Sequence, residues 1–231
     1  MTISTESRDI IESRLGMLFS GQFRKDNTTP MVVHSIDVAR RLERWGLPDP
    51  LIVAGYFHDV LEDVPEFPID SIRAEEGFDA DVDDAVVVQS DRLAIEIMGT
   101  ANMQEPAVAK SVELVQAVTY TEAEYAAERL AENRDIGKQT RKSMASERWS
   151  IARPDIQVVK CSDILSNLSS MAPLSGKFKM DYTAWAIPLL TIMHANLVRH
   201  NVASPEMSEE INIATREHDH WLKKSLEPSV F

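Results

Sequence analysis

Two histidines and two aspartates are the side chains of this sequence best suited to metal chemistry. His58 and Asp59 are adjacent, His34 lies upstream of them, and Asp163 lies far downstream. All four fall in stretches that read as apolar helices, and a carboxylate that faces a protein core is costly unless it is paired or binds an ion. Imidazoles and carboxylates without a thiolate suit manganese, iron or zinc. Together the four residues predict a divalent-metal site.

Two further acids follow the histidine–aspartate pair. In a helix, Glu62 lies four residues after His58 and Asp63 lies four residues after Asp59, so these side chains share one surface. A solvated helix end would explain Glu62 and Asp63 alone, but acids at the C-terminal end of a helix oppose its dipole. We therefore expect both acids to lie beside the metal.

A later stretch carries a similar arrangement. Lys160, Asp163 and Asn167 are three and four residues apart and therefore share one face of a helix. Taken alone, Asp163 is explained equally well as a capping or salt-bridged residue. Taken with the other three candidate ligands, it is better interpreted as the fourth ligand.

The composition narrows the classes of partner and compartment. The chain has 231 residues with 37 acidic and 24 basic side chains, and its net charge of −13 disfavours nucleic-acid binding, which needs a cationic surface. Its one cysteine, Cys161, cannot form an internal disulfide and fits a reducing compartment. The polar N-terminus does not resemble a signal peptide. The longest uncharged run, residues 183–198, is shorter than the ~20 apolar residues of a membrane span. We expect a cytoplasmic protein with no membrane partner.

Helical periodicity dominates the sequence, and an all-α fold follows from it. Helices are expected at residues 10–20, 31–45, 51–61, 156–171 and 179–197, with two or three more between 69 and 120, where 79–84 reads as an acidic turn. Residues 86–88 allow a short strand, but their flanks favour a helix. Residues 123–149 read as an exposed helix followed by a mobile basic segment. We divide the chain into one domain (1–200) and a C-terminal helix (201–231) that docks on the domain or on a second subunit, as in a homodimer.

Several short segments carry a family resemblance. Residues 58–63 read HDVLED and match an HDxxED box, residues 159–167 read VKCSDILSN, and residues 181–186 read DYTAWA. The last two are similar to segments of the form VKLADRLHN and EYFEWA, and a basic loop at residues 24–26 precedes them. In this order, over about residues 8–198, the segments resemble the HD superfamily of metal-dependent phosphohydrolases. More narrowly, they resemble the hydrolase domain of Rel/SpoT proteins and the small alarmone hydrolases.

This resemblance implies a single HD-domain helical bundle that hydrolyses the 3′-diphosphate of guanosine tetra- and pentaphosphate (ppGpp and pppGpp). It implies that His34, His58, Asp59 and Asp163 bind manganese, with iron and zinc as alternatives. It implies that Glu62 and Asp63 position and deprotonate the attacking water. It also implies that the substrate is bound by Arg24, Lys25, Lys160, Asn167 and Tyr182.

Departures from the family pattern leave two other functions open. Cys161 and Ser162 replace Leu and Ala, and Ser166 replaces His, which allows an HD phosphohydrolase acting on another nucleotide or phosphorylated metabolite. A non-catalytic nucleotide-binding module is the other alternative, and the presence of Glu62 and Asp63 weakens it. The bases Lys138, Arg141 and Lys142 suit substrate phosphates or a solvated helix equally well.

Overall fold

A computed structural model describes residues 3–76 and 82–226, and the regular elements in these ranges are helices. The helices are α1 (Thr5–Leu18), α2 (Val32–Arg44), α3 (Asp49–Phe57), α4 (Val60–Asp63), α5 (Ile69–Glu76), α6 (Val82–Ala101), α7 (Glu105–Val118), α8 (Glu122–Leu130), α9 (Arg134–Ser150), α10 (Pro154–Ser169), α11 (Gly176–Arg199) and α12 (Pro205–Leu226). Among the described residues, extended pairing is confined to an isolated bridge between Phe23 and Pro30. The predicted all-α fold is confirmed.

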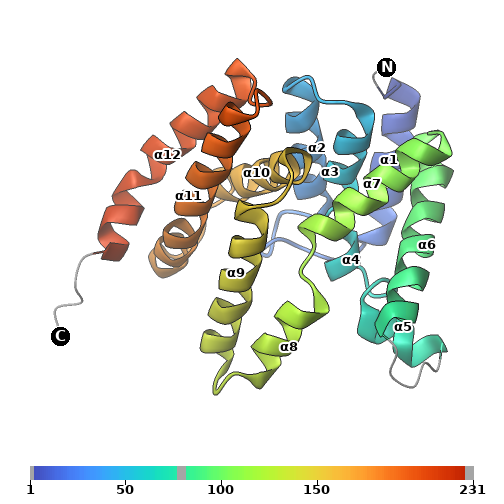
Figure 1. Ribbon diagram of the computed structural model, residues 1–231, viewed down its shortest axis with the longest axis horizontal. Helices are drawn as coiled ribbons and strands as arrows, with labels where there is room; N and C mark the ends of the chain where they lie inside the picture. Colours follow the sequence, from blue (N-terminus) through green and yellow to red (C-terminus); the bar gives the residue numbers. More distant parts are fainter. Residues whose placement is uncertain (1–2, 77–81, 227–231) are drawn as a thin grey trace.

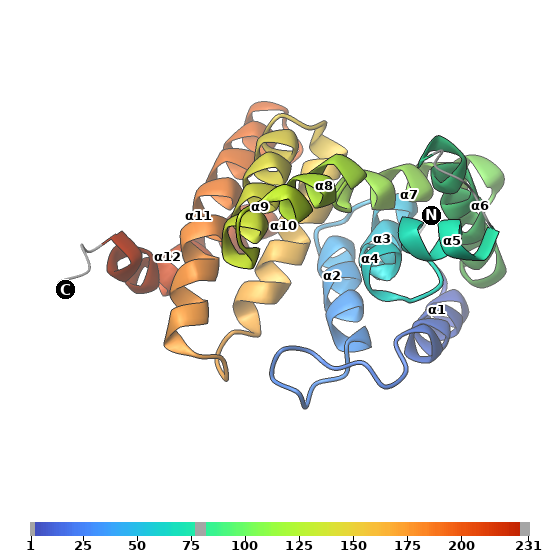
Figure 2. The same ribbon diagram turned by 90° about the horizontal axis from the view of Figure 1, so that it is seen from below.

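Helices α2, α3 and α10 form the centre of the bundle. They lie between α11 and α12 on one side and α1, α6 and α7 on the other (Figures 1 and 2). In α3 every residue from Leu51 to Phe57 is buried, as expected of a helix that is apolar on all sides. Helix α10 is buried continuously from Gln157 to Ser166. Polar side chains on these central helices are therefore held away from bulk solvent.

A close crossing of α2 and α3 brings the first two candidate ligands together. A Cβ atom added to Gly55 would lie 2.6 Å from Cδ1 of Leu42 and 3.1 Å from Cα of Ala39, so only glycine allows this approach. Leu42 and Ala39 lie on the same helix as His34, and Gly55 lies three residues before His58. The crossing thus fixes the separation of the two imidazoles.

The helix predicted for residues 51–61 is interrupted at the histidine–aspartate pair. Helix α3 ends at Phe57, and α4 begins at Val60. Nδ1 of His58 donates to the carbonyl oxygen of Gly55 (2.8 Å), which a continuous helix would offer to the amide of Asp59. The amides of Glu62 and Asp63 then bond to the carbonyl oxygen of Asp59. The sequence correctly grouped the acids with the pair, but the assumed continuous helix was wrong.

The prediction of a mobile basic segment within residues 123–149 was also wrong. Helix α8 begins with a capping box between Thr121 and Glu124, and α9 begins at the capping side chain of Asn133. The fully buried Trp149 anchors the end of α9. The many charged residues of α9 hid, at the level of sequence, the buried face through which this helix packs on its neighbours.

The remaining expectations concern peripheral segments. Residues 86–88 lie inside α6, as their flanks predicted. Of the expected acidic turn, residues 79–81 lie outside the described residues, and residues 82–84 belong to α6, so the turn prediction was wrong for them. Helix α12 packs against α11 and α10. None of the described helices has the length and apolarity needed to cross a bilayer.

Candidate active site

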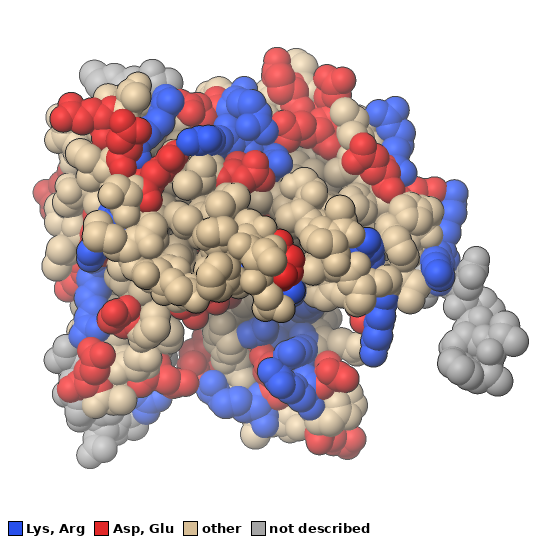
Figure 3. Space-filling model, turned by 180° about the vertical axis from the view of Figure 1, so that it is seen from behind, with Lys and Arg blue, Asp and Glu red and all other residues tan. Residues whose placement is uncertain are grey.

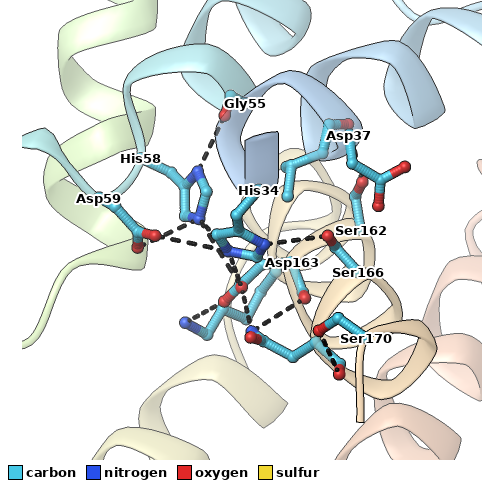
Figure 4. Close-up of polar contacts among 12 residues, drawn as sticks. His34, Asp37, Gly55, His58, Asp59, Ser162, Asp163, Ser166 and Ser170 are labelled. Atoms are coloured by element: carbon cyan, nitrogen blue, oxygen red, sulfur yellow. Dashed lines mark hydrogen bonds and ion pairs between the residues drawn. The ribbon is translucent and has the colours of Figure 1, made fainter. Parts of the chain in front are cut away.

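The four candidate ligands converge from three parts of the bundle (Figure 4). His34 comes from the first turn of α2, His58 and Asp59 from the junction of α3 and α4, and Asp163 from the middle of α10. The two Nε2 atoms of His34 and His58 lie 3.1 Å apart. Oδ1 of Asp59 lies 3.1 Å from Nε2 of His58, and Oδ1 of Asp163 lies 3.1 Å from Nε2 of His34. Two nitrogens and two carboxylate oxygens therefore face one another in the core.

The orientation of both imidazoles fits a metal site. Nδ1 of His58 is used by the Gly55 carbonyl, and Nδ1 of His34 lies 2.9 Å from Oγ of Ser166. Engaging the second ring nitrogen in this way is usual for metal-binding histidines, because it sets the tautomer and directs the other nitrogen. Ligand atoms of His34, His58 and Asp59 all lie within 4.8 Å of one another. The nitrogen and oxygen donors suit manganese, iron or zinc.

The electrostatics of the group favour a bound cation. Burial lowers the pKa of His34. Burial alone would also lower the pKa of His58, but the carboxylates of Asp59 and Asp163 outweigh it and raise that pKa well above its usual value. A metal must displace the proton that His58 otherwise retains. Metal affinity should therefore fall as the pH is lowered.

Asp163 is oriented by its neighbours on α10. Nζ of Lys160 lies 2.8 Å from Oδ2 of Asp163, and Nδ2 of Asn167 donates to Oδ1 (2.7 Å). Burial alone would lower the pKa of the Lys160 ammonium, but the Asp163 carboxylate raises it above its usual range. This ammonium also lies 4.0 Å from the ring centre of Trp149. Lys160, predicted to bind substrate, is thus directly paired with a candidate ligand.

Asn167 joins this group to the loop before α2. Nη2 of Arg24 donates to Oδ1 of Asn167 (2.9 Å) and to Oγ of Ser170 (2.8 Å). The loop itself is closed by Asp26, whose carboxylate accepts from the amides of Thr28 and Thr29 (both 2.9 Å). Arg24 is therefore held in place by groups of the protein itself.

A single cavity of about 440 Å³ contains every site residue named from the sequence. It is lined by His34, His58, Asp59 and Asp163, by Glu62 and Asp63, and by Arg24, Lys25, Lys160, Asn167 and Tyr182. The structure adds Arg141 and Lys142 from α9, which the sequence left undecided, and Tyr120, Phe178 and Trp185, which it missed. Phe178, Tyr182 and Trp185 are four and three residues apart on α11. This spacing places three aromatic rings on one face of the helix and could have been read from the sequence.

Glu62 is a candidate proton acceptor in this cavity. Its Oε1 atom accepts from the backbone amide of Tyr120 (2.9 Å). Burial raises the pKa of Glu62 to about 7, although the nearby Lys160 charge opposes the change. Burial and the charge of Asp59 raise the pKa of Asp63 to about 7 as well, but Asp63 is more exposed, so water screens its charge better. A carboxyl that titrates near neutral pH suits general acid–base catalysis.

Four cationic side chains surround the outer part of the cavity, and aromatic rings support three of them. The guanidinium carbon of Arg141 lies 4.2 Å from the ring centre of Tyr120, and Nζ of Lys25 lies 4.3 Å from that of Phe178. Lys142 lies over Trp185 at 5.0 Å, and Arg24 is the fourth cation. Figure 3 shows Lys and Arg side chains gathered around a recess at the lower middle of this face. The recess lies at the same height as α8 and α9 in Figure 1.

Arg141 forms an ion pair with Glu128 (3.1 Å), whereas Lys25 and Lys142 mainly face other cations. Desolvation and the charges of Arg24 and Lys138 lower the pKa of Lys25. Desolvation and the charges of Lys25 and Arg141 lower the pKa of Lys142. Mutual repulsion of this kind is relieved by an anion, and clustered Lys and Arg side chains are typical phosphate ligands. The cavity therefore combines a metal-type donor set with a cationic wall, in a protein whose net charge is −13.

The fold and site define an all-α bundle with a buried histidine–aspartate group at its centre. No family model matches the sequence. Among solved structures, the chain is similar to one described as a metazoan ortholog of SpoT that hydrolyses ppGpp and plays a role in starvation responses. The two share 17% sequence identity with a TM-score of 0.60, over 94% of this chain and 97% of the other. The resemblance inferred from the sequence is thereby confirmed for the fold.

Proposed function

We propose that this protein is a manganese-dependent hydrolase that removes the 3′-diphosphate of ppGpp and pppGpp. The products would be GDP or GTP and pyrophosphate. The observation that carries the proposal is the convergence of the four candidate ligands, the half-buried Glu62 and a cationic wall on one cavity. The activity described for the structurally similar metazoan protein supports the choice of substrate.

The residues of the cavity have complementary roles in this reaction. A divalent ion held by His34, His58, Asp59 and Asp163 would polarise a phosphoryl oxygen and lower the pKa of bound water. Glu62 accepts the proton of the water that attacks the phosphorus on the 3′ oxygen. The bond between that phosphorus and the 3′ oxygen then breaks, and the 3′ oxygen gains a proton. Asp63, at the more exposed edge, orients the attacking water.

The outer cavity suits the rest of a purine nucleotide. The rings of Phe178 and Tyr182 are stacked with centres 5.8 Å apart, and Trp185 meets Tyr182 edge to face at 5.3 Å. Such an aromatic wall offers a surface for the nucleobase or the ribose. The basic side chains of the loop before α2 and of α9 would then face the phosphates. Two widely separated phosphate groups would use both the metal and this cationic wall.

Replacing Arg24 with Ala tests the phosphate part of the proposal. Arg24 is already oriented by Asn167 and Ser170, so its guanidinium can bind phosphate with little ordering cost. A hydrogen bond to a charged group contributes about 1.5–3 kcal/mol, so KM for ppGpp should rise roughly tenfold or more. KM for a substrate with a single phosphate should change much less. Steady-state kinetics on both substrates measure the difference.

Arg40 provides the matched control for this variant. It is an exposed arginine on α2 that pairs with Glu12 outside the cavity. Arg40→Ala should leave both KM values unchanged. Equal responses of the two substrates to Arg24→Ala would remove the polyphosphate argument.

The family departures do not favour a different substrate. Cys161 and Ser162 are fully buried, and Oγ of Ser162 donates to the carbonyl oxygen of Val38 (2.9 Å). Ser166 contacts His34, and none of the three lines the cavity. These changes are accommodated in the core, so the alternative nucleotide or metabolite has no support from them. The non-catalytic alternative is opposed by Glu62, which lines the same cavity as the four candidate ligands.

A further inference from the structure

The turn between α7 and α8 is held by one arginine from the end of α9. Nη2 of Arg148 donates to the carbonyl oxygen of Thr119 (2.9 Å), and Nη1 donates to that of Ala117 (2.5 Å). Trp149 also donates to the Ala117 carbonyl through Nε1 (3.1 Å). Two carbonyls at the end of α7 are thus satisfied by the last turn of a different helix.

A buried carboxylate fixes the arginine in turn. Glu124 is only 3% exposed, and its two oxygens accept from Nε (2.9 Å) and Nη2 (3.0 Å) of Arg148. The amide of Thr121 donates to the same carboxylate (2.7 Å) as part of the capping box. A paired guanidinium and carboxylate of this geometry is directional as well as attractive. Arg148 and Glu124 therefore constrain the chain on both sides of Tyr120.

The constrained residue is the one that contacts the proposed base. The amide of Tyr120 donates to Oε1 of Glu62, and it lies between the fixed carbonyl of Thr119 and the fixed amide of Thr121. We propose that Arg148 is a positioning residue that orients the Glu62 carboxylate through this turn, and that Glu124 holds Arg148 for that purpose. The inference rests on the proposed function, which gives Glu62 its role as base.

The position of Arg148 separates it from the substrate-facing bases. Arg141 and Lys142, both about two turns earlier on α9, line the cavity, whereas Arg148 does not. Its removal should therefore affect the orientation of Glu62 rather than substrate binding. Because Trp149 keeps its own bond to Ala117, α9 should remain docked when Arg148 is changed.

The test compares Arg148→Met, Arg148→Lys and Glu124→Gln with the control Arg153→Met. Arg153 is an exposed arginine just beyond α9 that pairs with Glu113 and Asp155. A small misplacement of a reacting group can cost up to ~10²-fold in rate, so Arg148→Met should lower kcat by roughly tenfold or more. KM and bound metal should stay within about twofold of wild type, and Arg148→Lys should be intermediate because it loses the fork of donors. The control should match wild type.

A double variant distinguishes positioning from general structural support. In a Glu62→Gln background, Arg148→Met should lower kcat little further, because both changes remove the same function. A full additional loss in that background, a rise in KM without loss of kcat, or unchanged kcat in Arg148→Met would overturn the inference. Thermal melting identifies any variant that fails to fold, and Arg148→Lys then decides the question.

Hydrogen exchange of the Tyr120 amide separates this inference from the proposed function. That amide donates to Oε1 of Glu62, so its exchange should be faster in Arg148→Met than in wild type or in the control Arg153→Met. Unchanged exchange would overturn the positioning role even if wild type hydrolyses ppGpp. Inactive wild-type protein with the expected faster exchange would instead refute only the proposed function.

Discussion

Glu62→Gln is expected to lower kcat for ppGpp by ~10²-fold or more, the usual contribution of a general acid or base. Gln can still accept the Tyr120 amide hydrogen bond through its carbonyl oxygen, so the α7–α8 turn should keep its place. It cannot accept a proton from water. Metal content and KM should stay close to those of wild type. Steady-state kinetics and metal analysis of the purified variant measure both results.

The pH profile gives this prediction a definite sign. A base acts when deprotonated, so kcat should fall as the pH drops through the pKa of Glu62, which burial raises to about 7. A bound cation lowers that pKa, so the acidic limb should lie at or below neutral pH. In Glu62→Gln this limb should disappear. Glu66→Gln, an exposed acid near the same helix, should retain both the limb and the rate.

The metal-free protein offers a second readout of the same carboxyl. The folded-state pKa of Glu62 lies above its usual 4.5, so ionisation disfavours the fold as the pH rises from about 4.5 through 7. Glu62→Gln should therefore be more stable than wild type at pH 8 and gain nothing at pH 4. Equal stability at both pH values, together with unchanged turnover, would mean that Glu62 only terminates α4.

Asp163→Asn should lower metal affinity by at least ~10²-fold, because even groups behind the ligands are worth about 10–100-fold. The structure adds a consequence that the sequence did not reveal. Lys160 is 8% exposed and relies on Asp163 for its charge, and removing one member of a buried ion pair costs about 3–5 kcal/mol. The single variant should therefore lose stability as well as metal.

A double variant separates these two effects. Asp163→Asn with Lys160→Met removes both charges and should recover most of the stability while metal affinity stays low. Asp155→Asn is the control on the same helix, since its partner Lys110 is one-third exposed and can be solvated. Calorimetry for metal binding and denaturant unfolding measure the two quantities. Full metal affinity in Asp163→Asn would exclude Asp163 as a ligand.

The sequence predicted which residues line the cavity better than it predicted their local geometry. His58, Asp59, Glu62 and Asp63 were grouped by helical spacing, and they do line one cavity, although α3 and α4 are separate helices. Spacing cannot show that the His58 ring takes the Gly55 carbonyl and ends α3, because that bond depends on a side-chain rotamer. Glu62 and Asp63 still lie near His58 and Asp59 because α4 begins at Val60, directly after the pair.

Residues 123–149 show why part of the site was not predictable. The many charges of α9 hide the apolar character of its buried end. Its role depends on contacts with Ala117 of α7 and with α11, which are distant in sequence. In the sequence, Arg148 looks like one more solvated basic residue. In the structure it donates to two carbonyl oxygens at the end of α7, those of Ala117 and Thr119. Lys160 similarly reads as a base for phosphate until its pairing with Asp163 and Trp149 is seen. Periodicity reports which face is buried, and it does not report long-range polar partners.

Analysis of the products formed from ppGpp by the manganese-loaded protein tests the central claim most directly. Purified protein is stripped of metal, reloaded with one equivalent of Mn²⁺ and incubated with ppGpp, and the nucleotide and phosphate products are separated by chromatography. The account predicts GDP and pyrophosphate in equal amounts, with turnover that requires the metal and is lost in Glu62→Gln. Two results would contradict it. One is ppGpp that stays intact after prolonged incubation with fully metal-loaded protein, and the other is release of orthophosphate in place of pyrophosphate.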